Sequence, residues 1–171
     1  MQTIIKVEHP EGISGLKHDF QMTCGTVPQR FFSAPGRTEI CGNHTDHQRG
    51  CVLAAAVNLD ALAAVAENGT ELLRVQSEGY PMYTVELGKL EVQPDEENTT
   101  PALIRGVAAK FRRLGCSLRG LDIYVTSQVL PGSGLSSPAA FEVLSETSLN
   151  GLCSAGKLAQ LESAQIAKYS E

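Results

Sequence analysis

The sequence predicts a domain of mixed α/β class, and three observations lead to this prediction. Apolar residues between positions 103 and 114 fall at helical spacing, with Pro101 near the first turn and Gly115 at the end. Residues 121–126 alternate between apolar and polar side chains, which is the period-2 pattern of a half-buried strand. A glycine-rich turn and a second apolar helical segment follow this strand. With 171 residues, of which 42% are hydrophobic, the chain suits one globular domain.

The first half of the chain is expected to contain strands. Residues 31–32 are apolar and strand-like. Segment 51–66 is rich in alanine and would favour a helix by propensity alone, but Asn58 and Asp60 interrupt any apolar stripe. Apolar residues in segment 72–85 look like further strands. We therefore expect a meander of strands in this part of the chain.

The second half begins with an acidic stretch at 93–101, which is expected to be a surface loop. The strand at 121–126 is expected to run on towards Leu130. A helix should then extend to Leu152, with Ser137 as its N-cap and Pro138 at its first helical position.

A third helix is expected from Ser154 onward, and its apolar pattern is still running at Glu171. No glycine, asparagine or proline signal ends it. We therefore expect the chain to be part of a longer polypeptide.

Composition excludes several classes of protein. The five cysteines form an odd set without a Cys-x-x-Cys pair, which suits a reducing cytoplasm better than a disulfide scaffold. A net charge of −5 argues against a nucleic-acid surface, and the basic group Lys110, Arg112 and Arg113 is expected on the solvated face of a helix. No apolar run is long enough to span a bilayer, and the N-terminus lacks a signal peptide, so no membrane partner is expected.

The glycine-rich turn at 131–137 is a candidate anion site. Backbone N–H groups of such a turn, together with the positive end of the following helix dipole, attract phosphate. An ordinary strand-to-helix turn explains the same pattern equally well. The P-loop pattern is absent, and Ser137 replaces the third glycine of the dinucleotide-binding pattern. The candidate nucleotide-binding residues here are Gly132, Ser133, Gly134, Leu135, Ser136 and Ser137.

A second candidate site lies in segment 34–46. Arg37 supplies a fixed positive charge that can stabilise a transferring phosphoryl group, while His44 and Asp46 can hold sugar hydroxyls by hydrogen bonds. Two alternatives remain open at this point. His44 and Asp46 could cap a turn, or they could bind zinc or iron with His47, although the other two histidines lack ligand spacing.

Both motifs resemble signature motifs of galactokinases, a family of the GHMP small-molecule kinases. Residues 34–48 (APGRTEICGNHTDHQ) resemble the first motif, and residues 130–140 (LPGSGLSSPAA) resemble the second. Residues 167–171 resemble the start of the next conserved stretch of the family. The resemblance implies an N-terminal domain of the ribosomal protein S5 domain 2-like fold, in which helices pack on a mixed sheet. Residues 1–171 would form this single domain, and the family's C-terminal domain would be absent from the chain.

The implied activity is transfer of the ATP γ-phosphoryl group to the C1 hydroxyl of galactose, with Mg²⁺ as cofactor. In the resemblance, Arg37 matches the arginine that stabilises the transition state, Ser77 matches a serine near the nucleotide, and 132–137 match the phosphate loop. Glu171 matches the metal-binding glutamate, and Ser137 is the second expected Mg²⁺ ligand. The family's catalytic aspartate would lie beyond Glu171, so this chain is expected to be inactive alone.

The sugar site departs from the family pattern. His44 and Asp46 match sugar-binding residues, but Asn43 replaces a glutamate that grips the sugar, and His47 replaces a tyrosine. Pro138 replaces a serine whose hydroxyl binds magnesium. Two alternatives to galactose phosphorylation therefore stay open: a sugar and ATP sensor with weak catalysis, and a GHMP kinase with another acceptor.

Overall fold

The computed structural model describes residues 12–42, 51–97, 99–129, 134–135 and 137–153. The elements in chain order are α1 (Gly12–Cys24), β1 (Arg30–Cys41), β2 (Leu53–Glu67), β3 (Leu72–Ser77), β4 (Met82–Glu86), the 3-10 turn η2 (Pro94–Glu96), α2 (Thr100–Arg113), β5 (Leu121–Ser127) and α3 (Ser137–Cys153). Within the described residues, five strands form one sheet in the order β1-β2-β5-β3-β4. β3 and β5 run parallel and the other neighbours run antiparallel, which confirms the predicted mixed α/β class.

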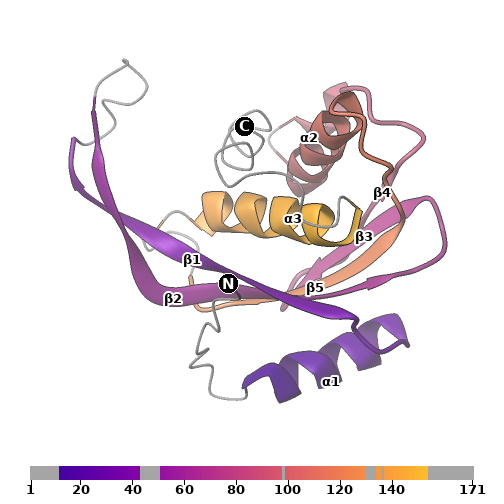
Figure 1. The fold of residues 1–171 in the computed structure, drawn as a ribbon, viewed down its shortest axis with the longest axis horizontal. Helices are drawn as coiled ribbons and strands as arrows, with labels where there is room; N and C mark the ends of the chain where they lie inside the picture. Colours follow the sequence, from indigo (N-terminus) through magenta and orange to yellow (C-terminus); the bar gives the residue numbers. More distant parts are fainter. Residues whose placement is uncertain (1–11, 43–50, 98, 130–133, 136, 154–171) are drawn as a thin grey trace.

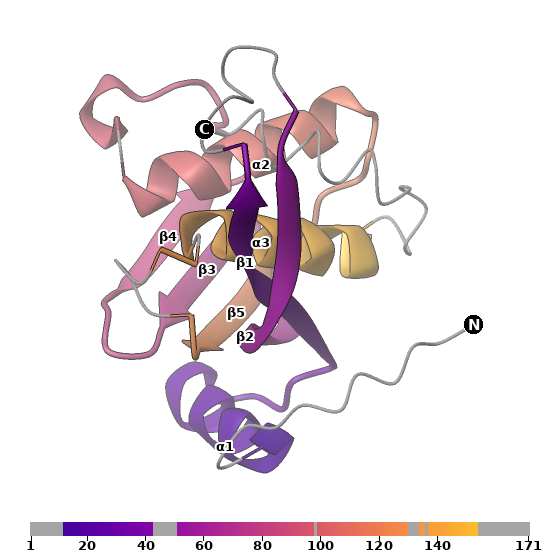
Figure 2. The same cartoon turned by 90° about the vertical axis from the view of Figure 1, so that its left-hand side faces the viewer.

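Helices cover both faces of the sheet (Figures 1 and 2). On one face, α2 and α3 enclose the larger apolar cluster, to which β2 contributes Ala63 and Val65. On the other face, Leu16 and Phe20 of α1 pack against Leu62 of β2. Alternate residues of β2 thus face opposite layers, as the period of a strand requires. The small alanine side chains of this strand contribute to the apolar clusters on both faces of the sheet.

β5 lies at the centre of the sheet and is buried on both faces. The prediction of a half-buried strand is therefore wrong for this element. Its polar positions face the α1 side, where Tyr124 packs against Leu16 and Phe20, while Asp122 and Thr126 are buried. The reason is α1, which the sequence analysis did not predict and which covers the face expected to be solvated. The strand ends at Ser127, and Leu130 lies outside the described residues.

The strands expected after residue 51 are confirmed by β2, β3 and β4, but they do not form the expected meander, because β5 lies between β2 and β3 in the sheet. β2 is one continuous strand of 15 residues despite its alanine content. Its second half, 61–67, pairs with both β1 and β5, whereas 53–60 pairs with β1 alone. The outer part of the β1–β2 hairpin therefore extends beyond the rest of the sheet (Figure 1). β1 also includes the first residues of motif 34–46, which lie in a strand and not in a loop.

Helix α2 agrees with its predicted spacing. It carries Pro101 in its first turn and ends before Gly115, which has a φ of +77°. Arg112 and Arg113 are exposed, as expected for a solvated face. Arg112 nevertheless has a structural contact, because it donates a hydrogen bond to the carbonyl oxygen of Leu87.

Helix α3 begins at Ser137 and ends at Cys153, close to the predicted bounds. The third helix expected from Ser154 onward lies outside the described residues. None of the described helices is long and apolar enough to cross a membrane.

Gly120 connects the start of β5 to the turn before β3 through two backbone hydrogen bonds. Its N–H donates to the carbonyl oxygen of Thr70 at 3.0 Å, and its own carbonyl accepts from the N–H of Asn68 at 3.1 Å. A Cβ at this position would lie 2.2 Å from the Thr70 carbonyl oxygen and 2.3 Å from Oδ1 of Asn68. We expect Gly120→Ala to lower the free energy of unfolding by about 2 kcal/mol, as overpacking against backbone does. Urea denaturation measures the loss.

Gly88→Ala is the matched control for Gly120→Ala. A Cβ at Gly88 would meet no atom within 4 Å. The control should change the free energy of unfolding by less than about 0.5 kcal/mol, as surface substitutions do. Equal effects of the two substitutions would contradict the assigned role of Gly120.

Candidate active site

The two sequence motifs meet where β1 passes the end of β5. The backbone N–H of Arg37 donates a hydrogen bond to the carbonyl oxygen of Leu135, at 3.0 Å. One residue earlier, Gly36 lies against Val57 and Val129, and a Cβ there would come within 3.0 Å of Cγ2 of Val129. A glycine at position 36 therefore lets β1 approach the segment that leads into the glycine-rich turn. The contact places the candidate arginine beside the candidate phosphate loop.

The described part of the glycine-rich turn leads directly into a helix N-terminus. Gly134 has a φ of +75°, a backbone conformation that favours glycine, and it is exposed. Leu135 is partly buried, and α3 begins at Ser137. The first N–H groups of a helix have no partner within the helix, and the helix dipole makes this end positive. The arrangement suits an anion such as phosphate.

The guanidinium of Arg37 is available for an anionic ligand. Its side chain is 46% exposed, and its Nη1 lies 3.6 Å from Oε2 of Glu39. An ion pair of this length at the surface contributes little stability. Arg37 can therefore direct its donors to a ligand without breaking a strong contact.

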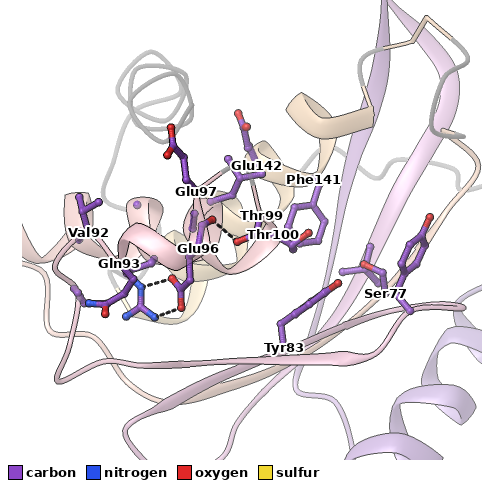
Figure 3. Close-up of a pocket in the computed structure, with 18 of the residues that line it drawn as sticks. Ser77, Tyr83, Val92, Gln93, Glu96, Glu97, Thr99, Thr100, Phe141 and Glu142 are labelled. Atoms are coloured by element: carbon purple, nitrogen blue, oxygen red, sulfur yellow. Dashed lines mark hydrogen bonds and ion pairs between the residues drawn. The ribbon is translucent and has the colours of Figure 1, made fainter.

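A cavity of about 1400 Å³ lies between the sheet and helices α2 and α3. Ser77 and Tyr83 line it from the sheet, while Phe141 and Glu142 line it from α3 (Figure 3). Segment 90–97 forms a further wall (Figure 3). The cavity also reaches Ser127 and Val129, shortly before the glycine-rich turn. Ser77, predicted near the nucleotide, thus opens into the same space that approaches the predicted phosphate loop.

Charged groups around the cavity are held by specific hydrogen bonds. Glu78 accepts a hydrogen bond from Oγ1 of Thr126 at 2.6 Å. Arg105 binds Glu96 through two hydrogen bonds of 2.8 and 2.7 Å. The hydrogen bond from Arg105 lowers the pKa of the Glu96 carboxyl, and the bond to Glu96 raises the pKa of the Arg105 guanidinium. Both groups therefore stay charged at neutral pH.

Comparison with known proteins assigns this arrangement to a family. The profile described as the galactokinase galactose-binding signature matches residues 18–67, and that of the GHMP kinases N terminal domain matches residues 102–171. A galactokinase of Streptomyces coelicolor is 34% identical over 137 residues, covering 80% of this chain and 35% of the relative. The chain belongs to the galactokinase family. It spans about a third of the length of that curated relative.

Solved structures share the fold of this galactokinase-family chain. The Lactococcus lactis galactokinase complexed with galactose superposes with a TM-score of 0.83 at 22% identity, over 92% of this chain and 41% of that one. The Streptococcus pneumoniae phosphomevalonate kinase in complex with phosphomevalonate and AMPPNP gives a TM-score of 0.61 at 18% identity, over 82% and 41% of the two chains. The predicted N-terminal GHMP kinase fold is thereby confirmed.

The structure describes part of the predicted galactokinase site. Arg37 and the described loop residues Gly134 and Leu135 lie together, and Ser77 lies in the cavity. Other predicted site residues lie outside the described residues: Asn43, His44, Asp46, Gly132, Ser133, Ser136 and Glu171. The position of Ser137 is described as the start of α3, but its side chain is not.

Two described cysteines of this galactokinase-family chain are unreactive by burial. Burial raises the pKa of the Cys24 thiol to about 11 and also raises that of Cys153, which disfavours the reactive thiolate at neutral pH. Within the described ranges, no three His, Cys, Asp or Glu side chains are grouped to hold a metal ion.

Several cavity residues of this galactokinase-family chain were not singled out by sequence reasoning. From the sequence, Tyr83 was predicted only to lie in a strand, and Phe141 only to lie in a helix. Glu142 is 3% exposed although it is charged, and it lines the cavity from α3. The pair of Arg105 and Glu96 has no recognisable sequence spacing, because the two residues lie on different elements and meet only in the fold.

Proposed function

We propose that the protein carrying this chain phosphorylates galactose at its C1 hydroxyl, with ATP as the phosphoryl donor. The observation that carries the proposal is the hydrogen bond between Arg37 and Leu135, which joins the two motifs at one helix N-terminus. The relatives support it, since they include galactokinases and a galactokinase structure with bound galactose. A related kinase structure holds AMPPNP, which supports the use of ATP.

The phosphate end of the nucleotide would lie at the N-terminus of α3. Gly134 exposes backbone there, and the first N–H groups of the helix can donate to phosphate oxygens. Arg37 would neutralise the charge that spreads over the phosphoryl oxygens during transfer. In phosphoryl transfer such positioning and charge stabilisation account for most of the catalysis, so little covalent chemistry is asked of the chain.

The base and ribose would occupy the cavity beside this helix. Tyr83 from the sheet and Phe141 from α3 supply aromatic surfaces, and Ser77 supplies a hydroxyl (Figure 3). Ligand sites are mostly apolar with a few polar groups that set orientation. The cavity has that character, and it extends towards the phosphate loop.

The residues proposed to hold Mg²⁺ are Ser137 and Glu171. Hydroxyl and carboxylate oxygens fit this ion, which also takes phosphate and water ligands. The start of α3 at Ser137 is next to the loop that Arg37 contacts, so this ligand position is on the phosphate side of the site. When bound, the ion supplies positive charge that offsets the charge of the phosphates. Pro138 offers no hydroxyl, so the chain relies on the serine before it.

Residues 1–171 are proposed to act as a single N-terminal domain that binds ATP and part of the sugar, in the cytoplasm, without nucleic-acid or membrane partners. Asn43, His44 and Asp46 are the proposed sugar contacts. Since Asn43 is neutral where galactokinases carry a glutamate, one charge-assisted hydrogen bond would be weaker.

A coupled assay of the intact protein tests the proposal. We expect ADP to form when ATP, Mg²⁺ and galactose are all present, and a substrate panel of hexoses and pentoses to rank galactose first. Turnover with a different sugar would reassign the acceptor. Absence of turnover with every sugar would overturn the kinase function.

Calorimetry on the same protein separates the kinase from a sensor. Tight binding of galactose and ATP without turnover, followed by turnover in Pro138→Ser, would favour the sensor. The reason is that serine restores the hydroxyl that proline lacks.

A further inference from the structure

We propose that Arg105 is a positioning residue for the nucleotide. It holds segment 87–99, of which residues 90–97 form one wall of the cavity, in its binding conformation through Glu96. The inference rests on the proposed ATP site and adds to it a residue that lies in neither signature motif. Arg105 acts by fixing the wall, and Glu96 is its partner on that wall.

Each of the three guanidinium nitrogens of Arg105 donates a hydrogen bond to this segment. Nε donates to Oε2 of Glu96 at 2.8 Å, and Nη2 donates to Oε1 at 2.7 Å. Nη1 donates to the carbonyl oxygen of Lys89. A two-bond contact with a carboxylate fixes direction as well as distance. One side chain therefore binds two residues of the segment that are seven positions apart in sequence.

Arg105 is itself anchored in a rigid part of the fold. It is 8% exposed and lies on α2 next to Ile104, which is in the main core. Arg112, two turns further along α2, donates a hydrogen bond to the carbonyl oxygen of Leu87. The helix thus contacts the segment at its beginning and near its end.

After Leu90, which packs against the core, the segment has few other contacts among the described residues. Leu87, at the start of the segment, is held by the core: its side chain is 3% exposed, and its N–H donates to the carbonyl oxygen of Glu71 at 2.8 Å. The other backbone hydrogen bonds are local: the N–H groups of Lys89, Glu96 and Thr99 bond to the carbonyls of Glu86, Gln93 and Glu96. Val92, at the middle of the segment, is 90% exposed. A stretch with few buried apolar contacts and no ladder partner has low local stability. We therefore infer that the contacts from α2 set the position of the part that follows Leu90.

The ion pair also stands at a boundary between two spaces. Arg105 and Glu96 line the large cavity and also a smaller polar pocket of about 260 Å³, which Thr84 and Glu86 line as well. Glu96, which is the last residue of η2, lies at the cavity (Figure 3). Breaking the ion pair would open the wall between the two spaces to water.

The positive charge of Arg105 would also reduce the repulsion between the carboxylates of the cavity wall and an anionic ligand. The carboxylates of Glu91, Glu96 and Glu97 all line the cavity. Besides Glu96, the charges of Glu86 and Glu91 raise the pKa of the Arg105 guanidinium, so its charge acts on several carboxylates of this wall. Loss of the arginine would leave them to repel a polyphosphate. Loss of Glu96 alone would remove the contact but not the positive charge.

Steady-state kinetics of the intact protein test the proposal with Arg105→Met and Glu96→Gln. Methionine retains the apolar stem and removes every donor, while glutamine keeps the shape of the partner and removes its charge. We expect the KM for ATP to rise about 10-fold in Arg105→Met, as for the loss of a charge-assisted hydrogen bond, and about threefold in Glu96→Gln. The kcat and the KM for galactose should change less than about twofold, since the contact positions the nucleotide wall only.

Hydrogen exchange measures the position of the wall without relying on activity. Amides in 87–99 should exchange faster in both variants, while those of β5 should keep their protection. The matched control is the pair of Arg119 and Glu67, which is also 2.8 Å long but exposed. Arg119→Met and Glu67→Gln should leave both the KM for ATP and the exchange of 87–99 unchanged.

The outcomes distinguish this inference from the proposed function. If the wild type phosphorylates galactose and both variants keep its KM for ATP, the positioning role is overturned and the function stands. If the wild type neither binds nor uses ATP, the proposed function fails, and with it the nucleotide role of Arg105. Should Arg105→Met fail to fold, Glu96→Gln decides, because its glutamine retains the size of a side chain that is 24% exposed.

Discussion

Arg37→Ala should lower the kcat of the intact protein by about 10²- to 10⁴-fold, the range for removal of a principal charge partner of a phosphoryl transition state. The backbone N–H of Arg37 donates to the carbonyl oxygen of Leu135 in the candidate phosphate loop, and among the described residues its side chain makes a loose contact with Glu39. In the proposed site the guanidinium would lie near the phosphates, and the described residues offer it no stronger ion pair. Because the effect arises in the transition state, the affinity for galactose should change much less than kcat.

Arg30→Ala is the matched control for Arg37→Ala. Arg30 lies at the start of the same strand, and its side chain donates to the carbonyl oxygen of Gly151 at 2.7 Å, away from the candidate loop. It should retain kcat within about twofold, as expected of a residue that makes no transition-state contact. A near wild-type kcat for Arg37→Ala would show that another cation stabilises the transferring group.

Arg74→Ala should lower the free energy of unfolding by about 3 kcal/mol, at the lower end of the range for breaking a buried ion pair. Asp122 of β5 is 2% exposed and receives hydrogen bonds of 2.7 and 2.6 Å from Nε and Nη2 of Arg74. Asn68 donates a further bond to Oδ1 at 2.7 Å. Removal of the arginine leaves a carboxylate in the interior without its cation, and one amide cannot replace that charge. Chemical denaturation monitored by far-UV circular dichroism measures the loss.

The two partners of this ion pair should not be equivalent. The side chain of Arg74 is 37% exposed, so it can turn to water when its partner is removed. Asp122→Asn should therefore cost less than Arg74→Ala. The control is Arg119→Ala, which breaks an exposed pair and should cost less than about 1 kcal/mol. An effect of Arg74→Ala no larger than that of Arg119→Ala would mean that Asp122 is stable in the interior without a cation.

Elements with a local pattern were predictable from sequence. Helix α2 shows this, because Pro101 and Gly115 mark its ends and the apolar positions between them repeat at helical spacing. The strand–turn–helix order around the glycine-rich turn was also correct. Period and turn chemistry are properties of neighbouring residues, so they can be read before any tertiary contact is known.

Burial was less predictable, because it depends on what covers each element. Asp122 and Tyr124 look like the solvated positions of a two-faced strand, yet both are buried. They are covered because α1, with Leu16 and Phe20, packs across that face from a segment a hundred residues earlier. The few apolar residues of α1 lie in a polar stretch, so their pattern in the sequence did not distinguish a helix from a loop.

The candidate site shows the same division. Sequence by itself determined the family resemblance, the glycine-rich turn, and the arginine at position 37, since each resides in a contiguous motif. Only the tertiary structure decided which distant residues meet. Arg37 bonds to Leu135, and Arg105 forms hydrogen bonds with Glu96. Ser77 lines the cavity together with Tyr83 and Phe141. The physical reason is that motifs record the chemistry of neighbouring residues, whereas a site requires distant segments to meet, and that meeting is set by strand order and by the packing of helices on the sheet.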